Sequence, residues 1–433
     1  MRLDYLFSDV TAVTLGEKGI LPNTWVGVKD GRIVWVGASA PDDAQADRII
    51  TGPRRVLIPG LVNAHTHIAM TAFRGFADDL PLHRWLNERI FPAEAKFSER
   101  GVYLSARLGM LEALAAGTTG ICDAYFKLSS IAEAAKECGI RANICNMLTW
   151  FGEGACPDAD NAFQEALALA RDYKDDPLVT ADAGLHAVYT SNPESWEKIG
   201  RFARENGMRL HIHIAETRKE VDDCRVQYGC SPTEALRRAG VLENPVTAAH
   251  CVYLDEADRA ILREAGAVIV HNPTSNCKLA SGFADVPAME GIRVALGTDG
   301  MASNNTHDLF GEMKLAALLA KACSLDASVL PARKVLEMAA QGGAAAMSRE
   351  GRAGRIEVGY DADLALLNFD TPALSPCYDV LSHLVYAACG RDVELTMVNG
   401  RVVWENGEFP GIDAERCMAE LREYCKKTFG DCV

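Results

Sequence analysis

Four polar side chains in this chain stand at points where apolar, strand-like runs end. The first run ends in His65-Thr66-His67, and two later runs end at His213 and Asp299. Because side chains alternate along a strand, both histidines of the first run point to the same side. A His-x-His pair alone is weak evidence, since ordinary sheet faces also carry it. Together the four residues predict one metal site, because three imidazoles and a carboxylate suit zinc or a similar first-row ion.

Apolar strand-like segments alternate with helical segments rich in Ala, Leu and Glu between residues 56 and 358. Eight strands with intervening helices predict an α/β fold, a (β/α)₈ TIM barrel, whose active site lies at the C-terminal ends of the strands. The predicted metal ligands fall at such ends. Strands are expected at residues 56–64, 119–123, 141–147, 179–185, 209–214, 246–249, 268–270 and 293–296. Helices are expected at residues 100–116, 130–138, 162–173, 193–206, 231–239, 255–264 and 308–322.

Both ends of the chain are predicted to form short strands and turns. Residues 25–37 have the pattern of a hairpin with Asp-Gly at its turn, and residues 396–404 repeat that pattern with Asn-Gly. Both dipeptides suit tight primed turns. We expect the two ends to pack together as one small β-sandwich. The predicted domains are residues 1–55 and 359–433 for the sandwich, with a terminal helix in the second part, and residues 56–358 for the metal-dependent barrel.

Composition excludes several classes of protein. At 433 residues the chain is long enough for one barrel and a smaller domain. Its formal net charge of −15 argues against binding to nucleic acid or an anionic membrane, because both require a basic face. No apolar run reaches the ~18 residues of a membrane span, and the start lacks the features of a signal peptide, so a cytoplasmic location is expected. The 14 cysteines include no Cys-x-x-Cys pair and are interpreted as reduced packing residues.

Three further polar residues lie at or just beyond predicted strand ends. Glu216 follows His213 by three residues, where a carboxyl group can reach the far side of a bound substrate as a proton carrier. His250 could contact a metal-bound water, and His186 could bind substrate. Each alone has a simpler interpretation, as a surface glutamate or a hydrogen-bonded core histidine. Their position beside four predicted ligands favours a function.

The remaining candidates are weaker. His211 shares a face with His213 but lies lower in the strand, so we predict that it supports a ligand and does not bind the metal. His271 closes the seventh predicted strand and could hold a neighbouring loop. Cys251 and Cys277 lie near the predicted site, where packing is preferred over a role as nucleophile. Ordinary loop or surface positions are expected for His83, His307 and His383.

Four segments around these residues resemble the amidohydrolase superfamily. They are residues 59–67 (PGLVNAHTH), 213–217 (HIAET), 271–276 (HNPTSN) and 296–305 (LGTDGMASNN). More narrowly, the chain is similar to the 5-methylthioadenosine/S-adenosylhomocysteine deaminase branch, which lies near chlorohydrolases and guanine or cytosine deaminases. The resemblance covers nearly the whole chain, including the split sandwich.

This resemblance implies the catalytic machinery. Glu216 would be the acid/base at the purine N1. His250 would orient the hydrolytic water, and Asp299 would help to remove its proton. One divalent metal ion, zinc, would be bound by His65, His67, His213 and Asp299.

Substrate contacts follow from the same resemblance. Glu94 matches the family's contact to the ribose hydroxyls, His186 matches another substrate contact, and Trp85 matches an aromatic beside the substrate. Members that process S-adenosylhomocysteine use arginines after strand 3 to hold the ribose and the amino-acid carboxylate. Here Asn146 stands where the first is expected, and residues 154–170 contain no arginine or lysine. A carboxylate ligand would lack its bidentate partner, so a neutral 5′ substituent is expected.

The expected function is therefore zinc-dependent hydrolytic deamination of an adenosine-type nucleoside to the inosine analogue plus ammonia. The candidate substrates are 5-methylthioadenosine and adenosine, with S-adenosylhomocysteine as a further candidate. The alternative is removal of an amine or chloride from another heterocycle, of guanine, cytosine, pterin or triazine type, on the same site. A binuclear amidase is disfavoured, since residues 179–186 hold no lysine to bridge two metals. The Pro-Cys-x-x-Cys motif of other zinc deaminases is absent as well. A noncatalytic binding protein is a remote alternative, because every predicted ligand is present. The resemblance suggests a homo-oligomer that binds a small heterocycle.

Overall fold

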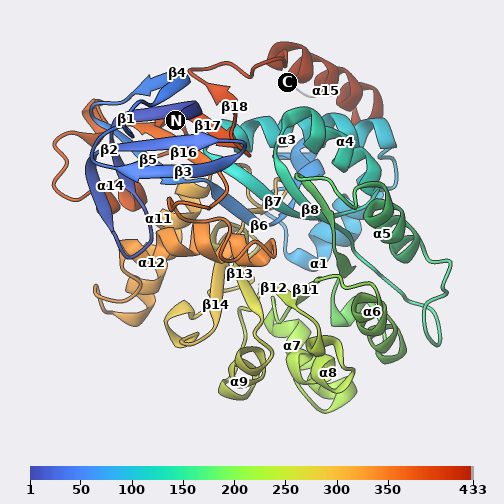
Figure 1. The fold of residues 1–433 in the computed structure, drawn as a ribbon. Coiled ribbons are helices and arrows are strands. Elements are labelled where there is room, and N and C mark those ends of the chain that lie inside the picture. The colour runs from blue at the N-terminus through green and yellow to red at the C-terminus, as the bar shows by residue number, and fades with distance from the viewer. Residues whose placement is uncertain (431–433) are drawn as a thin grey trace.

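Ten short strands form two parallel sheets in the middle of the chain (Figure 1). The computed structural model describes residues 1–430, apart from the side chain of His83. One sheet has the order β15-β6-β7-β8-β9 and the other the order β10-β11-β12-β13-β14. Helices follow most of these strands, which confirms the predicted α/β class. The strands are β6 (Leu61–His67), β7 (Thr118–Tyr125), β8 (Arg141–Asn146), β9 (Val179–Ala181), β10 (Ala183–Leu185), β11 (Leu210–Ile214), β12 (Val246–His250), β13 (Val268–His271), β14 (Arg293–Leu296) and β15 (Asp299–Gly300).

Each helix expected from the sequence is present, with its ends shifted by one or two residues at most. These helices are α3 (Glu99–Ala115), α4 (Leu128–Cys138), α5 (Asn161–Asp172), α6 (Pro193–Glu205), α8 (Pro232–Arg238), α9 (Glu256–Glu264) and α11 (Leu309–Ser324). A further helix, α7 (Arg218–Tyr228), was not predicted, because its polar sequence shows no clear apolar period. Its start is marked instead by Thr217, whose hydroxyl accepts a hydrogen bond from the Glu220 amide at 3.1 Å. Also unpredicted are α10 (Pro273–Lys278), α12 (Ala332–Glu337) and α14 (Val380–Tyr386).

The first predicted barrel strand is in fact two strands in different sheets. β5 (Arg55–Pro59) pairs with strands from both ends of the chain, and β6 begins after Gly60. A Cβ atom on Gly60 would lie 2.2 Å from Thr119 Oγ1, so only glycine fits where the chain crosses from one sheet to the other. The predicted boundary after residue 55 therefore falls inside β5. The expectation of one continuous strand over residues 56–64 was wrong, because an unbroken apolar run does not reveal a change of sheet.

Strands from the two chain ends share one eight-stranded sheet, at the upper left of Figure 1. Its order is β18-β17-β16-β5-β1-β2-β3, with β4 paired to β1. The two predicted hairpins are present as β2–β3 and β17–β18. Whether these strands form a two-layered sandwich stays a prediction. The strands are β1 (Arg2–Val13), β2 (Ile20–Lys29), β3 (Arg32–Gly37), β4 (Gln45–Thr51), β16 (Leu364–Asn368), β17 (Val393–Val398) and β18 (Arg401–Glu405).

The C-terminal helix α15 (Ala414–Phe429) lies against α3 (Figure 1). The Tyr424 hydroxyl accepts a hydrogen bond from the Ser98 amide, just before α3, at 3.0 Å. The predicted terminal helix is therefore present and covers an outer helix of the parallel sheets. Within residues 1–430, no helix combines the length and the apolar character that crossing a membrane requires.

Candidate metal and catalytic site

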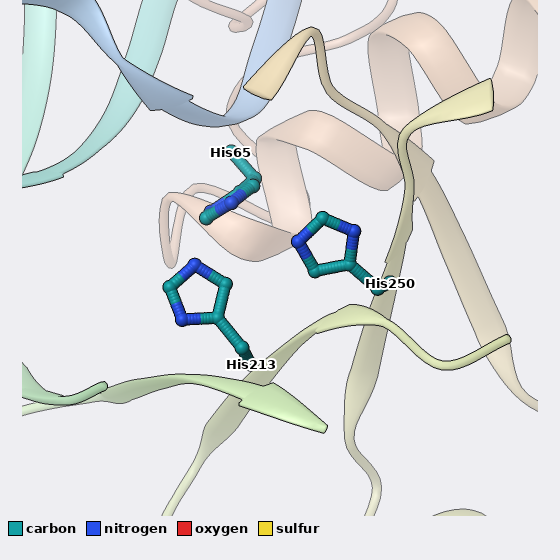
Figure 2. A group of neighbouring side chains, drawn as sticks. All are labelled: His65, His213 and His250. Atoms are coloured by element: carbon teal, nitrogen blue, oxygen red, sulfur yellow. The ribbon is translucent and has the colours of Figure 1, made fainter. Parts of the chain in front are cut away.

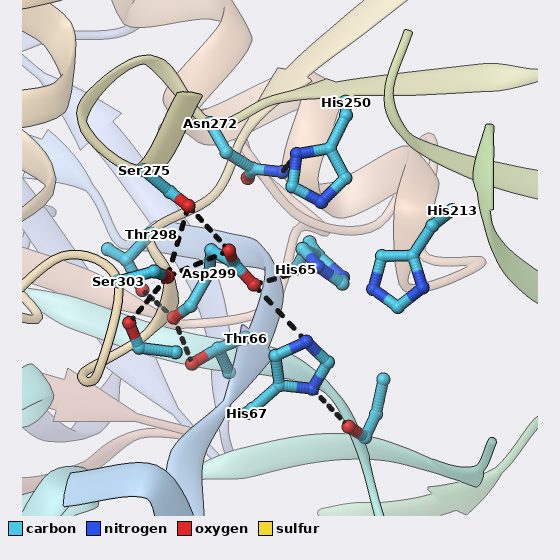
Figure 3. Close-up of polar contacts among 12 residues, drawn as sticks. His65, Thr66, His67, His213, His250, Asn272, Ser275, Thr298, Asp299 and Ser303 are labelled. Atoms are coloured by element: carbon cyan, nitrogen blue, oxygen red, sulfur yellow. Dashed lines mark hydrogen bonds and ion pairs between the residues drawn. The ribbon is translucent and has the colours of Figure 1, made fainter. Parts of the chain in front are cut away.

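Strands far apart in the sequence bring the four predicted ligands to one point (Figure 3), and Figure 2 shows two of them, His65 and His213, beside His250. His65 and His67 end β6, His213 lies near the end of β11, and Asp299 begins β15. Asp299 reaches the first two because β15 pairs with β6, which sets Asp299 opposite Thr66. Asp299 Oδ1 lies 3.3 Å from His65 Nε2 and 3.2 Å from His67 Nε2.

Each imidazole has one ring nitrogen occupied by the protein. His65 Nδ1 lies 2.8 Å from His211 Nε2, and His213 Nδ1 donates to the His186 carbonyl oxygen at 2.7 Å. His67 Nδ1 donates to the Ala124 carbonyl oxygen (Figure 3). A donating Nδ1–H leaves the lone pair on Nε2, the nitrogen that a metal ion would bind. The hydrogen bonds therefore select the tautomer suited to metal binding.

The donor set fits a metal ion such as zinc. His65 Nε2 is buried and makes no well-aligned hydrogen bond among the described residues; its near neighbour at 3.3 Å, Asp299 Oδ1, is itself a candidate ligand, so one bound ion would complete both atoms. Candidate ligand atoms of His65, His67 and Asp299 lie within 4.8 Å of one another, as do those of His65, His213 and His250. Burial lowers the pKa of His65 to about 3, whereas Asp299 outweighs burial at His67 and raises its pKa to about 9, so a cation bound there would displace a proton from His67. Three imidazole nitrogens and one carboxylate oxygen are a typical zinc environment.

Two serines that the sequence analysis did not single out hold Asp299. Its Oδ2 atom accepts hydrogen bonds from Ser275 Oγ at 2.6 Å and Ser303 Oγ at 2.9 Å (Figure 3). Oδ1 is left to face the histidines. Asp299 also has a φ of 61°, an uncommon conformation for a residue with a side chain. The signal in the sequence was that both serines lie in the segments that resemble the superfamily.

Glu216 and His250 lie together beside the ligands. Glu216 Oε2 is 3.9 Å from His250 Nε2, and His250 Nδ1 donates to Asn276 Oδ1 at 2.8 Å. Burial raises the pKa of Glu216, while the nearby His250 opposes this effect. Glu216 therefore keeps a proton to higher pH than an ordinary glutamate, and His250, whose Nδ1–H is donated to Asn276, turns Nε2 toward the site.

A second buried glutamate fixes the backbone at Glu216. Glu220 Oε1 accepts from the Ala215 amide at 2.9 Å, and its Oε2 accepts from the Glu216 amide at 2.8 Å. Ala215 has a φ of 51°, so this turn is held in a sparsely populated conformation. Glu220 was missed because nothing in its local sequence distinguishes it from other helix-starting glutamates.

A cavity of about 410 Å³ adjoins the ligands. All four predicted substrate contacts line it, as do Glu216 and His250; the four are Trp85, Glu94, Asn146 and His186. Burial raises the pKa of Glu94 to about 7 and lowers that of His186 to about 4. The Asn146 amide donates to Glu165 Oε2 at 2.5 Å. No arginine or lysine of the described residues lines the cavity, whereas Asp160 does.

The other histidines divide into buried and peripheral positions. His211 is buried against His65, and His271 ends β13 with both ring nitrogens buried and without partners among the described residues. His307 lies in a loop, one of the two expected positions, and it is fully buried there, with Nε2 3.0 Å from Thr71 Oγ1. His383 is partly exposed on α14, and the side chain of His83 lies outside the described residues. Burial raises the pKa of the Cys251 thiol well above its usual value, as expected of a packing residue.

Comparison with known proteins gives matches over nearly the whole chain. The amidohydrolase family model matches residues 56–403. A 5-methylthioadenosine/S-adenosylhomocysteine deaminase of Desulforudis audaxviator (strain MP104C) is 41% identical over 408 residues, 93% of this chain and 94% of that protein. An adenosine deaminase from Xanthomonas campestris, solved with bound zinc, is 36% identical with a TM-score of 0.94 and covers 99% of both chains. Atrazine chlorohydrolase from Arthrobacter aurescens TC1, complexed with zinc, is 26% identical with a TM-score of 0.90, over 97% of this chain and 100% of the other. These likenesses indicate a TIM-barrel-type α/β fold.

Proposed function

The chain belongs to the amidohydrolase family, and from this premise we propose that it is a zinc-dependent deaminase of adenosine-type nucleosides. The products are the inosine analogue and ammonia. The observation that carries this function is that three histidines and one carboxylate meet beside a cavity that Glu216 also lines, and that burial raises the pKa of Glu216. The chain is similar to a methylthioadenosine/S-adenosylhomocysteine deaminase and to an adenosine deaminase. This similarity favours adenosine-type substrates over the other substrates that such a site could hydrolyse.

The roles of the residues follow from their positions. His65, His67, His213 and Asp299 would hold a zinc ion, and the bound ion would supply an activated water by lowering the pKa of that water from about 16 toward 7. Glu216, protonated, donates to the ring nitrogen beside the amine-bearing carbon and makes that carbon electrophilic. His250 and Asp299 accept hydrogen bonds from the attacking water and help to remove its proton. His250 then delivers the proton taken from the water to the departing ammonia, and Glu216 recovers its proton from the hydroxyl group that becomes the carbonyl. General acid–base help of this kind contributes roughly 10²–10⁴-fold.

The substrate contacts divide along the cavity. We assign Glu94 to the ribose hydroxyls, where a carboxylate can accept from both, and His186 and Trp85 to the walls around the base. Asn146 lies at the 5′ end with its amide already donated to Glu165. Asp160 lines the cavity, and no arginine or lysine of the described residues does. A carboxylate on the substrate would therefore have no cationic partner, so the preferred substrate has a neutral 5′ group, as in methylthioadenosine or adenosine.

A second candidate function keeps the site and changes the ring. The likeness to atrazine chlorohydrolase supports hydrolysis of a triazine-type or other aminated heterocycle. The metal ligands are the same for these reactions, because the residues of the cavity wall contact the ring and the leaving group and thereby determine the substrate.

The finer architecture is also proposed. The two parallel sheets close into one (β/α)₈ barrel near residues 56–358, and the shared sheet of residues 1–55 and 359–433 folds into a small sandwich. Assembly of copies into a homo-oligomer and a cytoplasmic location remain predictions. Light scattering during size-exclusion chromatography and cell fractionation would test them.

The deciding experiment is ammonia release from zinc-loaded protein, with metal-stripped protein as the control. The panel holds methylthioadenosine, adenosine, S-adenosylhomocysteine, guanine, cytosine and an aminotriazine. Release from the adenosine-type compounds alone supports the proposal. Release only from a free base or the triazine would move the function to the second candidate.

The 5′ preference has its own test. We expect kcat/KM for methylthioadenosine to exceed that for S-adenosylhomocysteine by at least about tenfold, the cost of a carboxylate without its charged partner. Equal values, or a preference for S-adenosylhomocysteine, would contradict the assignment of the 5′ end.

A further inference from the structure

A serine hydroxyl contacts the Glu216 carboxyl group. Ser281 Oγ donates to Glu216 Oε1 at 2.9 Å, and the two residues are 3% and 6% exposed. The other carboxyl oxygen, Oε2, lies 3.9 Å from His250 Nε2 and accepts no hydrogen bond from any side chain or amide seen in residues 1–430. The two oxygens therefore have different surroundings: Oε1 accepts a hydrogen bond from Ser281, and Oε2 faces His250 without one.

The backbone around Ser281 is bent into uncommon conformations. Ala280 has a φ of 52° and Gly282 a φ of 131°, and the Ser281 amide donates to the Asn276 carbonyl oxygen at 2.9 Å. A Cβ atom on Gly282 would lie 2.7 Å from Tyr253 Oη, so glycine is required there. Unfavourable backbone conformations persist where the surroundings enforce them, and they cluster at functional sites. This turn brings the Ser281 hydroxyl to Glu216.

The same short segment holds both members of the proposed acid–base pair. Asn276, in α10, accepts from His250 Nδ1, and its carbonyl oxygen anchors the turn that carries Ser281. Neither Asn276 nor Ser281 lines the cavity. Both contact residues that do line it.

A serine hydroxyl has one hydrogen to donate, and no acceptor other than Glu216 Oε1 is found for it in the described part of the chain. A proton on Oε1 would compete with that hydrogen and leave a buried hydroxyl unpaired, which is costly. A proton on Oε2 meets no such conflict. We propose that Ser281 is a positioning residue that keeps the acidic proton of Glu216 on Oε2, the oxygen beside His250. This inference rests on the proposed role of Glu216 as proton donor.

The electrostatic surroundings agree with a proton-bearing Glu216. Burial raises its pKa, and the negative charge of Asp299 acts in the same direction, whereas His250, His67 and the Ser281 hydrogen bond oppose this. Glu220, on the neighbouring turn of chain, is a further acidic group close enough to interact. Glu216 therefore holds its proton to higher pH than an ordinary glutamate, and the effect of Ser281 is on where that proton lies.

The first test is steady-state kinetics of the zinc-loaded full chain with methylthioadenosine as the substrate. Ser281→Ala is expected to lower kcat by about tenfold to a hundredfold with KM changed less than about twofold, because one hydrogen bond to the carboxylate that forms as Glu216 gives up its proton has that size. Ser281→Thr keeps the hydroxyl and should restore most of kcat. Ser195→Ala is the matched control: Ser195 is a fully buried serine that accepts from the Cys156 amide at 3.1 Å and lies outside the cavity. It should keep its kcat, and zinc content and thermal midpoint are measured for all variants.

The second test is a double-mutant cycle with Glu216→Gln. If Ser281 acts through the acidic proton, Ser281→Ala should change the residual rate of Glu216→Gln by less than about twofold. An equal loss in both backgrounds, or a Ser281→Ala enzyme with wild-type kcat, overturns the inference. A Glu216→Gln enzyme with wild-type kcat would instead remove Glu216 from the proposed function, so the two failures are distinguishable.

Discussion

At the scale of single residues, the chemistry of this site depends on which atom of each side chain the protein leaves free. His213 gives its Nδ1–H to a carbonyl oxygen and keeps Nε2 for the centre. Asp299 gives Oδ2 to two serines and keeps Oδ1. Glu216 follows the same rule, with Oε1 occupied and Oε2 free. Orientation of this kind fixes the reacting atoms before the substrate arrives, which lowers the cost of reaching the transition state.

Glu216→Gln removes the acid and keeps the size of the side chain. We expect a loss of about 10²–10⁴-fold in kcat, the usual contribution of a positioned acid or base, with zinc content unchanged. Ammonia release and metal analysis of the same preparation measure both quantities. Near-normal turnover would falsify the assignment of Glu216 as proton donor.

Glu94 makes binding of the ribose depend on pH. Burial raises its pKa to about 7, so below pH 7 the carboxyl is increasingly protonated and loses its ability to accept from both hydroxyls. We expect kcat/KM of the wild-type enzyme for adenosine to fall as pH drops from 8 to 6. The Glu94→Gln variant has no carboxyl group to protonate at this position, so its kcat/KM should not show this fall. Parallel pH profiles for the two enzymes would exclude Glu94 from ribose binding.

At the scale of elements, the turn between β11 and α7 positions the proposed acid. Its backbone amides at residues 215 and 216 both donate to Glu220, which lies in the first turn of α7. The helix and the strand end are thereby joined at the residue that performs the chemistry. The unpredicted helix α7 thus has a direct part in the site.

Glu220→Gln should disturb this turn. One amide N–H₂ of the new side chain would face a backbone N–H, and two donors cannot pair. We expect kcat/KM to fall by at least about tenfold, as a displaced catalytic group commonly costs. Glu264→Gln, at the exposed end of α9, is the control with the same chemical change and should behave as the wild type. Comparable kinetics for the two variants would show that the turn does not need Glu220.

At the scale of the whole molecule, a buried ion pair joins the parallel sheets to the sheet built from the chain ends. Arg141, the first residue of β8, donates from Nε and Nη2 to the Asp363 carboxylate at 2.7 and 3.0 Å. The same side chain donates to the Asn399 side chain at the β17–β18 turn. Both charged side chains are nearly fully buried, at 3% and 6% exposure. The two parts of the chain are therefore connected through charges that water does not screen.

Arg141→Ala would leave Asp363 buried without its partner. We expect the free energy of unfolding to fall by about 3–5 kcal/mol, the typical cost of breaking a buried pair. Arg293→Ala is the matched control, because Arg293 pairs with Glu350 at the surface with 45% and 62% exposure, and its loss should cost less than about 1 kcal/mol. Urea denaturation of both variants measures the difference. Equal losses would mean that the buried pair does not stabilise the junction.

Local patterns accounted for seven helices between residues 99 and 324, the terminal helix, the two hairpins and the position of each candidate ligand along the chain. Strand alternation placed His65 and His67 on one side, and apolar runs ending in polar residues marked the edge of the sheets. The break at Gly60 could not be predicted, because both halves of that run are equally apolar. The burial of His307 was missed for a similar reason: its neighbours in sequence are polar, and its cover comes from Thr71 and α3.

The sequence by itself determined which side chains were available at the strand ends, because strand period and apolar runs are properties of neighbouring residues. Only the tertiary structure decided which atoms meet. Pairing of β15 with β6 brings Asp299 to His65, and the turn at Ser281 brings a hydroxyl to Glu216, 65 residues away in the chain. Contacts of this kind depend on the closure of long loops and on the packing of whole elements, which no local pattern encodes.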